Sequence, residues 1–122
     1  MSELSSTIDT YLEAYGETDA ERRAQLIEQV WTKDGRLVDP PLDAEGHEGI
    51  SGMAAAVQSQ FPGHRFRRTS GVDAHHDVAR YGWDLVSADG AVVLSGMDVA
   101  ELDGDRIRRV TGFFGDLPTK DA

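Results

Sequence analysis

The sequence contains no cysteine among its 122 residues. This absence excludes disulfide bonds, thiol nucleophiles and zinc sites built on thiolates. The sequence also lacks a long apolar run, so it predicts no membrane-spanning helix and no membrane partner. Residues 1–6 contain no basic region followed by an apolar stretch and do not resemble a secretory signal. We therefore expect an intracellular protein, with the cytoplasm as its default location.

Positive charge is also scarce in this chain. The sequence has 12 lysines and arginines but 22 aspartates and glutamates, which gives a net charge of −10. A chain this acidic repels nucleic acid and anionic membranes at long range, so neither is a predicted partner. The acidic residues are scattered rather than gathered in one block, which is typical of a solubilising surface.

Only four histidines are present. His75 and His76 are adjacent, and on a strand they would point to opposite faces and could not chelate one metal together. His47 and His64 lie in or beside predicted loops. Because no His-x-His or His-x-x-x-His pair occurs, we expect no metal. No phosphate-binding glycine loop or nucleophile elbow is found, and no cofactor is predicted.

Three helices are predicted in the first half of the chain from the spacing of apolar residues. The first, ending at Gly16, has the stripe Leu4, Ile8, Leu12 and Tyr15. The second opens with a capping-box pattern at residues 18–21, and its apolar side includes Ala24, Ile27, Val30 and Trp31. The third ends at Pro62-Gly63 and has the stripe Ile50, Met53, Ala54, Val57 and Phe61.

The rest of the chain reads as strands. Asp34-Gly35 predicts a turn before a short strand over residues 36–39, which the two following prolines end. Residues 42–49 are predicted to form a loop. Four further strands are expected over residues 64–72, 76–86, 91–102 and 106–114, with hairpin turns at 88–90 and 103–105. We therefore predict that residues 1–122 form a single α+β domain with three N-terminal helices packed on a curved, mostly antiparallel sheet.

Two acids and a phenol stand on predicted core faces. Because side chains alternate along a strand, Asp98 is predicted to lie on the same face as Leu94, Gly96, Ala100 and Leu102. Asp39 is predicted to share a face with Leu37 in the same way. Tyr11 lies on or beside the apolar stripe of the first helix. An ionisable group on a core face is costly unless it is hydrogen-bonded or neutral, so this set indicates a pocket with tuned proton chemistry. For either aspartate alone, a structural role such as backbone capping remains open.

Four stretches of the sequence resemble the ketosteroid isomerases of the nuclear transport factor 2-like superfamily, which includes the SnoaL-like proteins. They are residues 11–19, with a tyrosine eight residues before the aspartate that opens the second helix, and Val38-Asp39-Pro40, Gly96-Met97-Asp98-Val99 and residues 109–115. The resemblance implies a cone-shaped α+β barrel. It also implies that Asp39 is a general base and that Tyr11 and a protonated Asp98 donate hydrogen bonds to an enolate oxygen.

Further residues are predicted to line the ligand pocket of such a fold. Trp31, Met53, Val57, Phe61 and Phe114 are the apolar candidates. On residues 76–86, His76 and Arg80 share one face, while Tyr81 and Trp83 share the other, and the pattern does not decide which face points inward. Inward-facing His76 and Arg80 would make a polar pocket, whereas Trp83 and its neighbours would suit a flat apolar ligand.

Two functions remain open from the sequence. The first is an isomerase that moves a proton on a small, apolar, enolisable ketone, with Tyr11, Asp39 and Asp98 as its catalytic residues. The second is a non-catalytic small-molecule binding or dimerisation module of the same fold. In both cases the expected partners are a small apolar molecule and a second copy of the chain, because the uncovered sheet face favours a homodimer.

Overall fold

The computed structural model describes residues 2–121, which form three helices and a seven-stranded sheet. In chain order the elements are α1 (Ser2–Gly16), α2 (Ala20–Val30), β1 (Trp31–Val38), β2 (Asp43–Glu45), α3 (Gly46–Gln60), β3 (Arg65–Arg68), β4 (Asp73–His75), β5 (Val78–Val86), β6 (Val92–Asp103) and β7 (Arg106–Phe114). The strand order is β2-β1-β7-β6-β5-β3, and β4 also pairs with β5. β1 and β7 run parallel, and the other pairs are antiparallel.

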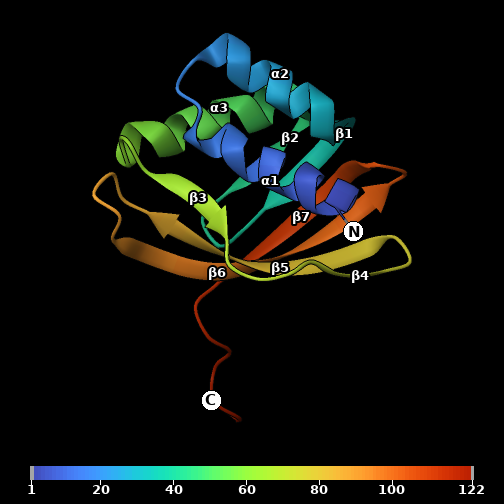
Figure 1. Ribbon diagram of the computed structural model, residues 1–122, viewed down its shortest axis with the longest axis vertical. Helices are drawn as coiled ribbons and strands as arrows, with labels where there is room; N and C mark the ends of the chain where they lie inside the picture. The colour runs from blue at the N-terminus through green and yellow to red at the C-terminus, as the bar shows by residue number, and fades with distance from the viewer. Residues whose placement is uncertain (1, 122) are drawn as a thin grey trace.

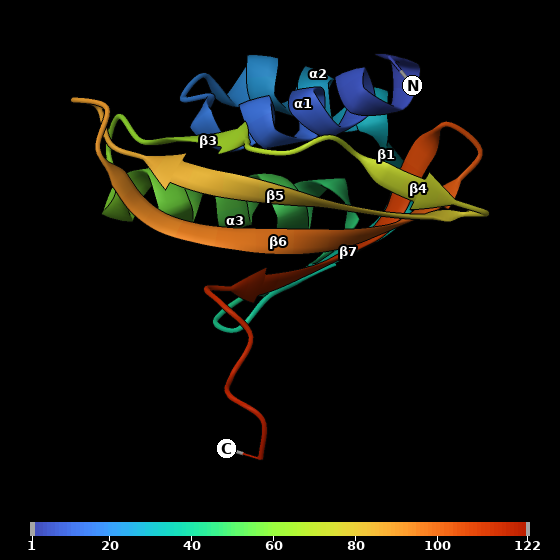
Figure 2. The ribbon, with the colours of Figure 1, turned by 60° about the horizontal axis from the view of Figure 1, so that its bottom comes forward.

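The three helices pack together against one face of the sheet (Figure 1). Figure 2 shows that β5 and β6 bend around this helical layer, so the sheet is concave towards the helices. The sheet does not close into a complete barrel, because β2 and β3 stand at its two edges. The predicted α+β class, with helices on a curved, mostly antiparallel sheet, is confirmed.

The helices largely follow their predicted boundaries, but the cap of α2 differs. Asp19 rather than Thr18 is the N-cap, and its side chain accepts a hydrogen bond from the backbone nitrogen of Glu21 at 3.3 Å. Asp19 has extended backbone angles, as an N-cap residue should. The capping-box interpretation therefore placed the N-cap one residue too early.

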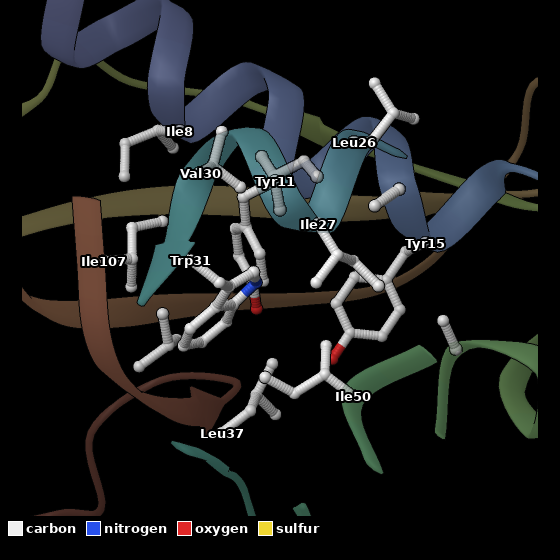
Figure 3. Packing of buried hydrophobic residues seen from close by; sticks show 14 of the residues in the cluster. Ile8, Tyr11, Tyr15, Leu26, Ile27, Val30, Trp31, Leu37, Ile50 and Ile107 are labelled. Atoms are coloured by element: carbon white, nitrogen blue, oxygen red, sulfur yellow. The ribbon is translucent and has the colours of Figure 1, made fainter. Parts of the chain in front are cut away.

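Trp31 is the first residue of β1 and not part of α2, which corrects the prediction. Its indole ring is 1% exposed and meets Tyr11 edge-to-face, with ring centroids 5.6 Å apart (Figure 3). The ring also covers Gly35, where a Cβ would lie only 2.3 Å from it. Asp34-Gly35 is thus an irregular section inside β1 rather than a turn, and the pairing of β1 with β7 shifts register there.

Other predicted boundaries also change. Residues 43–45 form strand β2, where a loop was expected, and α3 begins at Gly46. β3 is shorter than predicted, while β4 was missed because its three residues are all exposed. Among the described residues 2–121, no helix combines the length and apolar character that a membrane span requires.

The adjacent histidines also differ from expectation. His76 lies in the turn between β4 and β5 with a positive φ of 52°. Its Nδ1 atom lies 2.9 Å from Nδ1 of His75, so the two side chains converge. The prediction that they point to opposite faces was wrong, because it assumed an unbroken strand through both residues.

Candidate functional site

A cavity of about 420 Å³ lies between the helical layer and the concave face of the sheet. Its wall is mostly apolar, with side chains from α1, α3 and the sheet that include Leu12, Val57, Phe61, Leu85, Leu94 and Phe114. Tyr11, Asp39 and Asp98 line the same cavity. An apolar chamber of this size with a few convergent polar groups is the usual form of a small-molecule site.

Asp98 projects from β6 into this cavity and is only 4% exposed. The Tyr81 hydroxyl donates to its Oδ2 atom at 2.9 Å, and the Trp83 indole nitrogen donates to its Oδ1 atom at 2.9 Å. Burial raises the pKa of Asp98 to about 6, although these two hydrogen bonds oppose the rise. The nearby Asp39 raises that pKa further by like-charge repulsion.

Asp39 follows directly after β1 and is half-buried. The backbone nitrogen of Leu42 donates to its Oδ1 atom at 3.0 Å across the two prolines, which fixes the side chain at the edge of the cavity. Burial raises the pKa of Asp39, and the Leu42 hydrogen bond opposes that rise.

Gly112 on β7 brings the two acids together. It pairs with Asp98 in the β6–β7 register. A Cβ at Gly112 would lie 3.0 Å from Oδ1 of Asp98 and 3.1 Å from Cβ of Asp39. A side chain here would crowd both acids, so Gly112 leaves room for the carboxyl pair.

Two phenols from α1 belong to the polar part of the site, which also includes Gln60 of α3. Tyr11 and Tyr15 are four residues apart, so they share one face of the helix, and their rings meet edge-to-face at 5.6 Å. Figure 3 shows both hydroxyl groups on the side of their rings that points away from α1. Burial raises the pKa of each phenol well above its ordinary value, so both remain neutral donors at physiological pH.

The structure decides which predicted residues reach the cavity. Val57, Phe61, Trp83 and Phe114 line it together with Tyr11, Asp39 and Asp98. Trp31 and Met53 are buried in the neighbouring core and do not line it.

His76 and Arg80 lie outside the cavity, so the polar-pocket alternative was wrong. Both are exposed, and Arg80 donates from Nε to Asp73 on the neighbouring β4 at 2.8 Å. The buried face of β5 instead carries Ala79, Tyr81, Trp83 and Leu85.

Three aromatic residues of the site were not singled out as site residues from the sequence. Tyr15 was predicted only as a stripe residue, and Phe66 only as part of a strand. Tyr81 was considered only as one of the residues on a strand face that could point inward. Tyr81 pairs with Asp98 across the β5–β6 ladder, but a register shift between Leu85 and Val86 separates this pair from the turn at residues 88–90, so the hairpin register alone would not have placed it.

No protein-family model and no curated protein matches this chain. Among solved structures, it is similar to a SnoaL-like family protein from Agrobacterium tumefaciens that is named as a candidate isomerase. The two are 39% identical over 95% of this chain and 100% of the other, with a TM-score of 0.88. A candidate ketosteroid isomerase from Kribbella flavida is 16% identical over 99% of this chain and 84% of its own, with a TM-score of 0.68.

A third similar structure is a protein from Catenulispora acidiphila with a ketosteroid isomerase-like fold, determined in complex with trimethylamine. It is 14% identical over 89% of this chain and 85% of its own, with a TM-score of 0.72. The fold is thus that of the nuclear transport factor 2-like proteins. At 39% identity over nearly its whole length, the chain belongs to the SnoaL-like family.

Proposed function

We propose that this protein is an isomerase that moves a proton between two carbons of a small, largely apolar, enolisable ketone. The observation that carries the proposal is that Tyr11, Asp39 and Asp98 line one cavity whose remaining wall is mostly apolar. A relative that is 39% identical is itself named as a candidate isomerase, which supports the same reaction class.

Asp39 is the general base in this proposal. Its Oδ1 atom is occupied by the Leu42 backbone, which leaves Oδ2 to take the α-proton of the ketone and return it at the γ-carbon. The raised pKa of Asp39 makes it a better proton acceptor than an ordinary aspartate. The double bond shifts into conjugation with the carbonyl, and no proton is gained or lost overall.

Tyr11 and Asp98 stabilise the enolate oxygen that forms in between. Tyr11 donates from its neutral hydroxyl, and Asp98 donates when it is protonated. Each oxygen of Asp98 accepts one hydrogen bond from the protein, so lone pairs remain for a proton facing the ligand. Tyr81 and Trp83 act as positioning residues, because they fix the direction in which the Asp98 carboxyl points.

The test is the conversion of a β,γ-unsaturated ketosteroid, and of the smaller 3-cyclohexenone, to the conjugated enone, followed by ultraviolet absorbance. We expect turnover by the wild type and a loss of at least about 100-fold in Asp39→Asn. Asp34→Asn is the matched control, since Asp34 is an exposed acid on the preceding strand and should leave turnover unchanged. A folded wild-type protein that converts neither ketone would contradict the proposal.

A second candidate is non-catalytic binding of a small molecule in the same cavity. It is favoured by the fixed hydrogen bonds from Tyr81 and Trp83, which suit a carboxylate that serves as a permanent acceptor for a ligand. Under this alternative, ligands would raise the melting temperature of the protein while neither ketone is converted.

A further inference from the structure

Among the residues that the structure describes, the cavity is lined by acidic side chains and by no basic side chain. Asp39 and Asp98 line it, and none of its lining residues is a lysine, arginine or histidine. Within residues 2–121, none of the ion pairs involves either acid. We propose that the cavity binds a small organic ammonium ion, whose positive charge pairs with these two carboxylates. This inference rests on the proposed function only in taking the cavity as the ligand site.

A buried carboxylate needs a counter-charge or full hydrogen bonding to be tolerated. Asp98 accepts hydrogen bonds from two neutral donors, and no lysine, arginine or histidine of the described residues forms an ion pair with it. Two arginines that follow or precede cavity-lining residues in the chain are paired with other acids: Arg68 contacts Asp9 at 2.8 Å, and Arg36 contacts Asp43 at 2.8 Å. The positive charge that this site lacks can therefore be supplied by a ligand.

The aromatic wall favours an organic cation over a metal ion. Trp83 is held edge-to-face between Phe66 and Phe114, with ring centroids at 5.3 and 5.8 Å, and Phe66 meets Tyr15 in the same way at 5.0 Å. Aromatic faces attract alkylammonium groups, whose methyl or methylene carbons also contact apolar walls. Within residues 2–121, no group of three or more acidic or histidine side chains is arranged to hold a metal ion.

Long-range charge acts in the same direction. The net charge of −10 draws cations towards the protein. Leu42 lines the cavity, and the exposed acid Glu45 follows three residues later on β2, whereas Asp43 is paired with Arg36. A cationic ligand would therefore meet an attractive potential on its approach.

The test compares choline with 3,3-dimethylbutan-1-ol by isothermal titration calorimetry at matched ionic strength. The two molecules have the same shape, but only choline is charged. We expect the wild type to bind choline at least about tenfold more tightly. Asp98→Asn should remove this preference and still fold, because the amide oxygen can accept from Trp83 while the Tyr81 hydroxyl rotates to accept from the amide nitrogen.

Asp39→Asn provides a second cavity variant and should weaken the preference. Asp34→Asn removes one negative charge outside the cavity and should retain it. Equal binding of the two probes by the wild type, or an unchanged preference in both cavity variants, would overturn the inference. Choline binding without ketone turnover would contradict only the proposed isomerase activity. Ketone turnover without a preference for choline would contradict only the proposed ammonium site.

Discussion

At the scale of single residues, the pKa of Asp98 results from two opposing effects of its environment. Burial among apolar side chains disfavours its charge, while the donors Tyr81 and Trp83 favour that charge. The balance leaves the pKa at about 6, so Asp98 changes its protonation state just below neutral pH. This value allows the protonated donor that isomerisation needs and the carboxylate that an ammonium ligand needs, at different pH.

The pKa of Asp98 predicts how stability depends on pH. The folded protein holds the Asp98 proton more tightly than the unfolded chain, so the neutral side chain favours folding at about pH 4 and this contribution is lost as pH rises through about 6. Relative to Asp98→Asn, the wild type should lose about 2 kcal/mol of unfolding free energy between about pH 4 and about pH 6. Urea unfolding of both proteins at several pH values measures this, and a constant difference between them would refute the prediction.

Gly112 makes the second prediction at this scale. Gly112→Ala would push a methyl group against Asp98 and Asp39, so it should displace the acids and destabilise the fold by about 1–3 kcal/mol. Gly52→Ala in α3 is the matched control, because no atom lies within 4 Å of its added Cβ and alanine favours a helix. Urea unfolding should show opposite signs for the two variants, and equal effects would mean that Gly112 has no special role.

At the scale of elements, α2 depends on its N-cap. Asp19→Ala should cost about 1 kcal/mol, because the first turn of α2 loses a hydrogen-bond acceptor. Thr18→Ala should change the unfolding free energy little, since within residues 2–121 no side-chain hydrogen bond to this helix comes from Thr18. Thermal unfolding of both variants measures these effects. A larger loss of stability in Thr18→Ala than in Asp19→Ala would support the capping-box interpretation instead.

Much of the fold could be predicted because alternation and turn residues act locally. The alternation of side chains along β6 correctly predicted that Asp98 points inward. Gly90 and Gly104 in the two hairpin turns have the positive φ that their sequences suggested. Trp31 was misplaced because its apolar spacing continues that of α2, and only tertiary packing of its ring over Gly35 shows that the helix has ended. The inward face of β5 also depended on pairing with β6, which local pattern does not contain.

At the scale of the whole molecule, the sheet face opposite the helices carries exposed apolar side chains. Val93 and Phe113 are 49% and 53% exposed. We propose that this face forms a homodimer, because large exposed apolar side chains on a sheet favour association. Light scattering coupled to size exclusion should give twice the chain mass for the wild type and the single mass for Phe113→Lys. A monomeric wild type would defeat this proposal.

We propose that one largely apolar cavity holds a base that moves a proton on a ketone, together with two donors that stabilise the enolate oxygen. The most direct test of this proposal is deuterium incorporation at the α-carbon of 3-cyclohexenone in D₂O, followed by proton NMR, because it detects proton abstraction even without net isomerisation. We expect exchange by the wild type and by Asp34→Asn, and an exchange rate at least about 100-fold lower in Asp39→Asn. Exchange at the buffer rate with folded wild type, or full exchange in Asp39→Asn, would contradict the proposal.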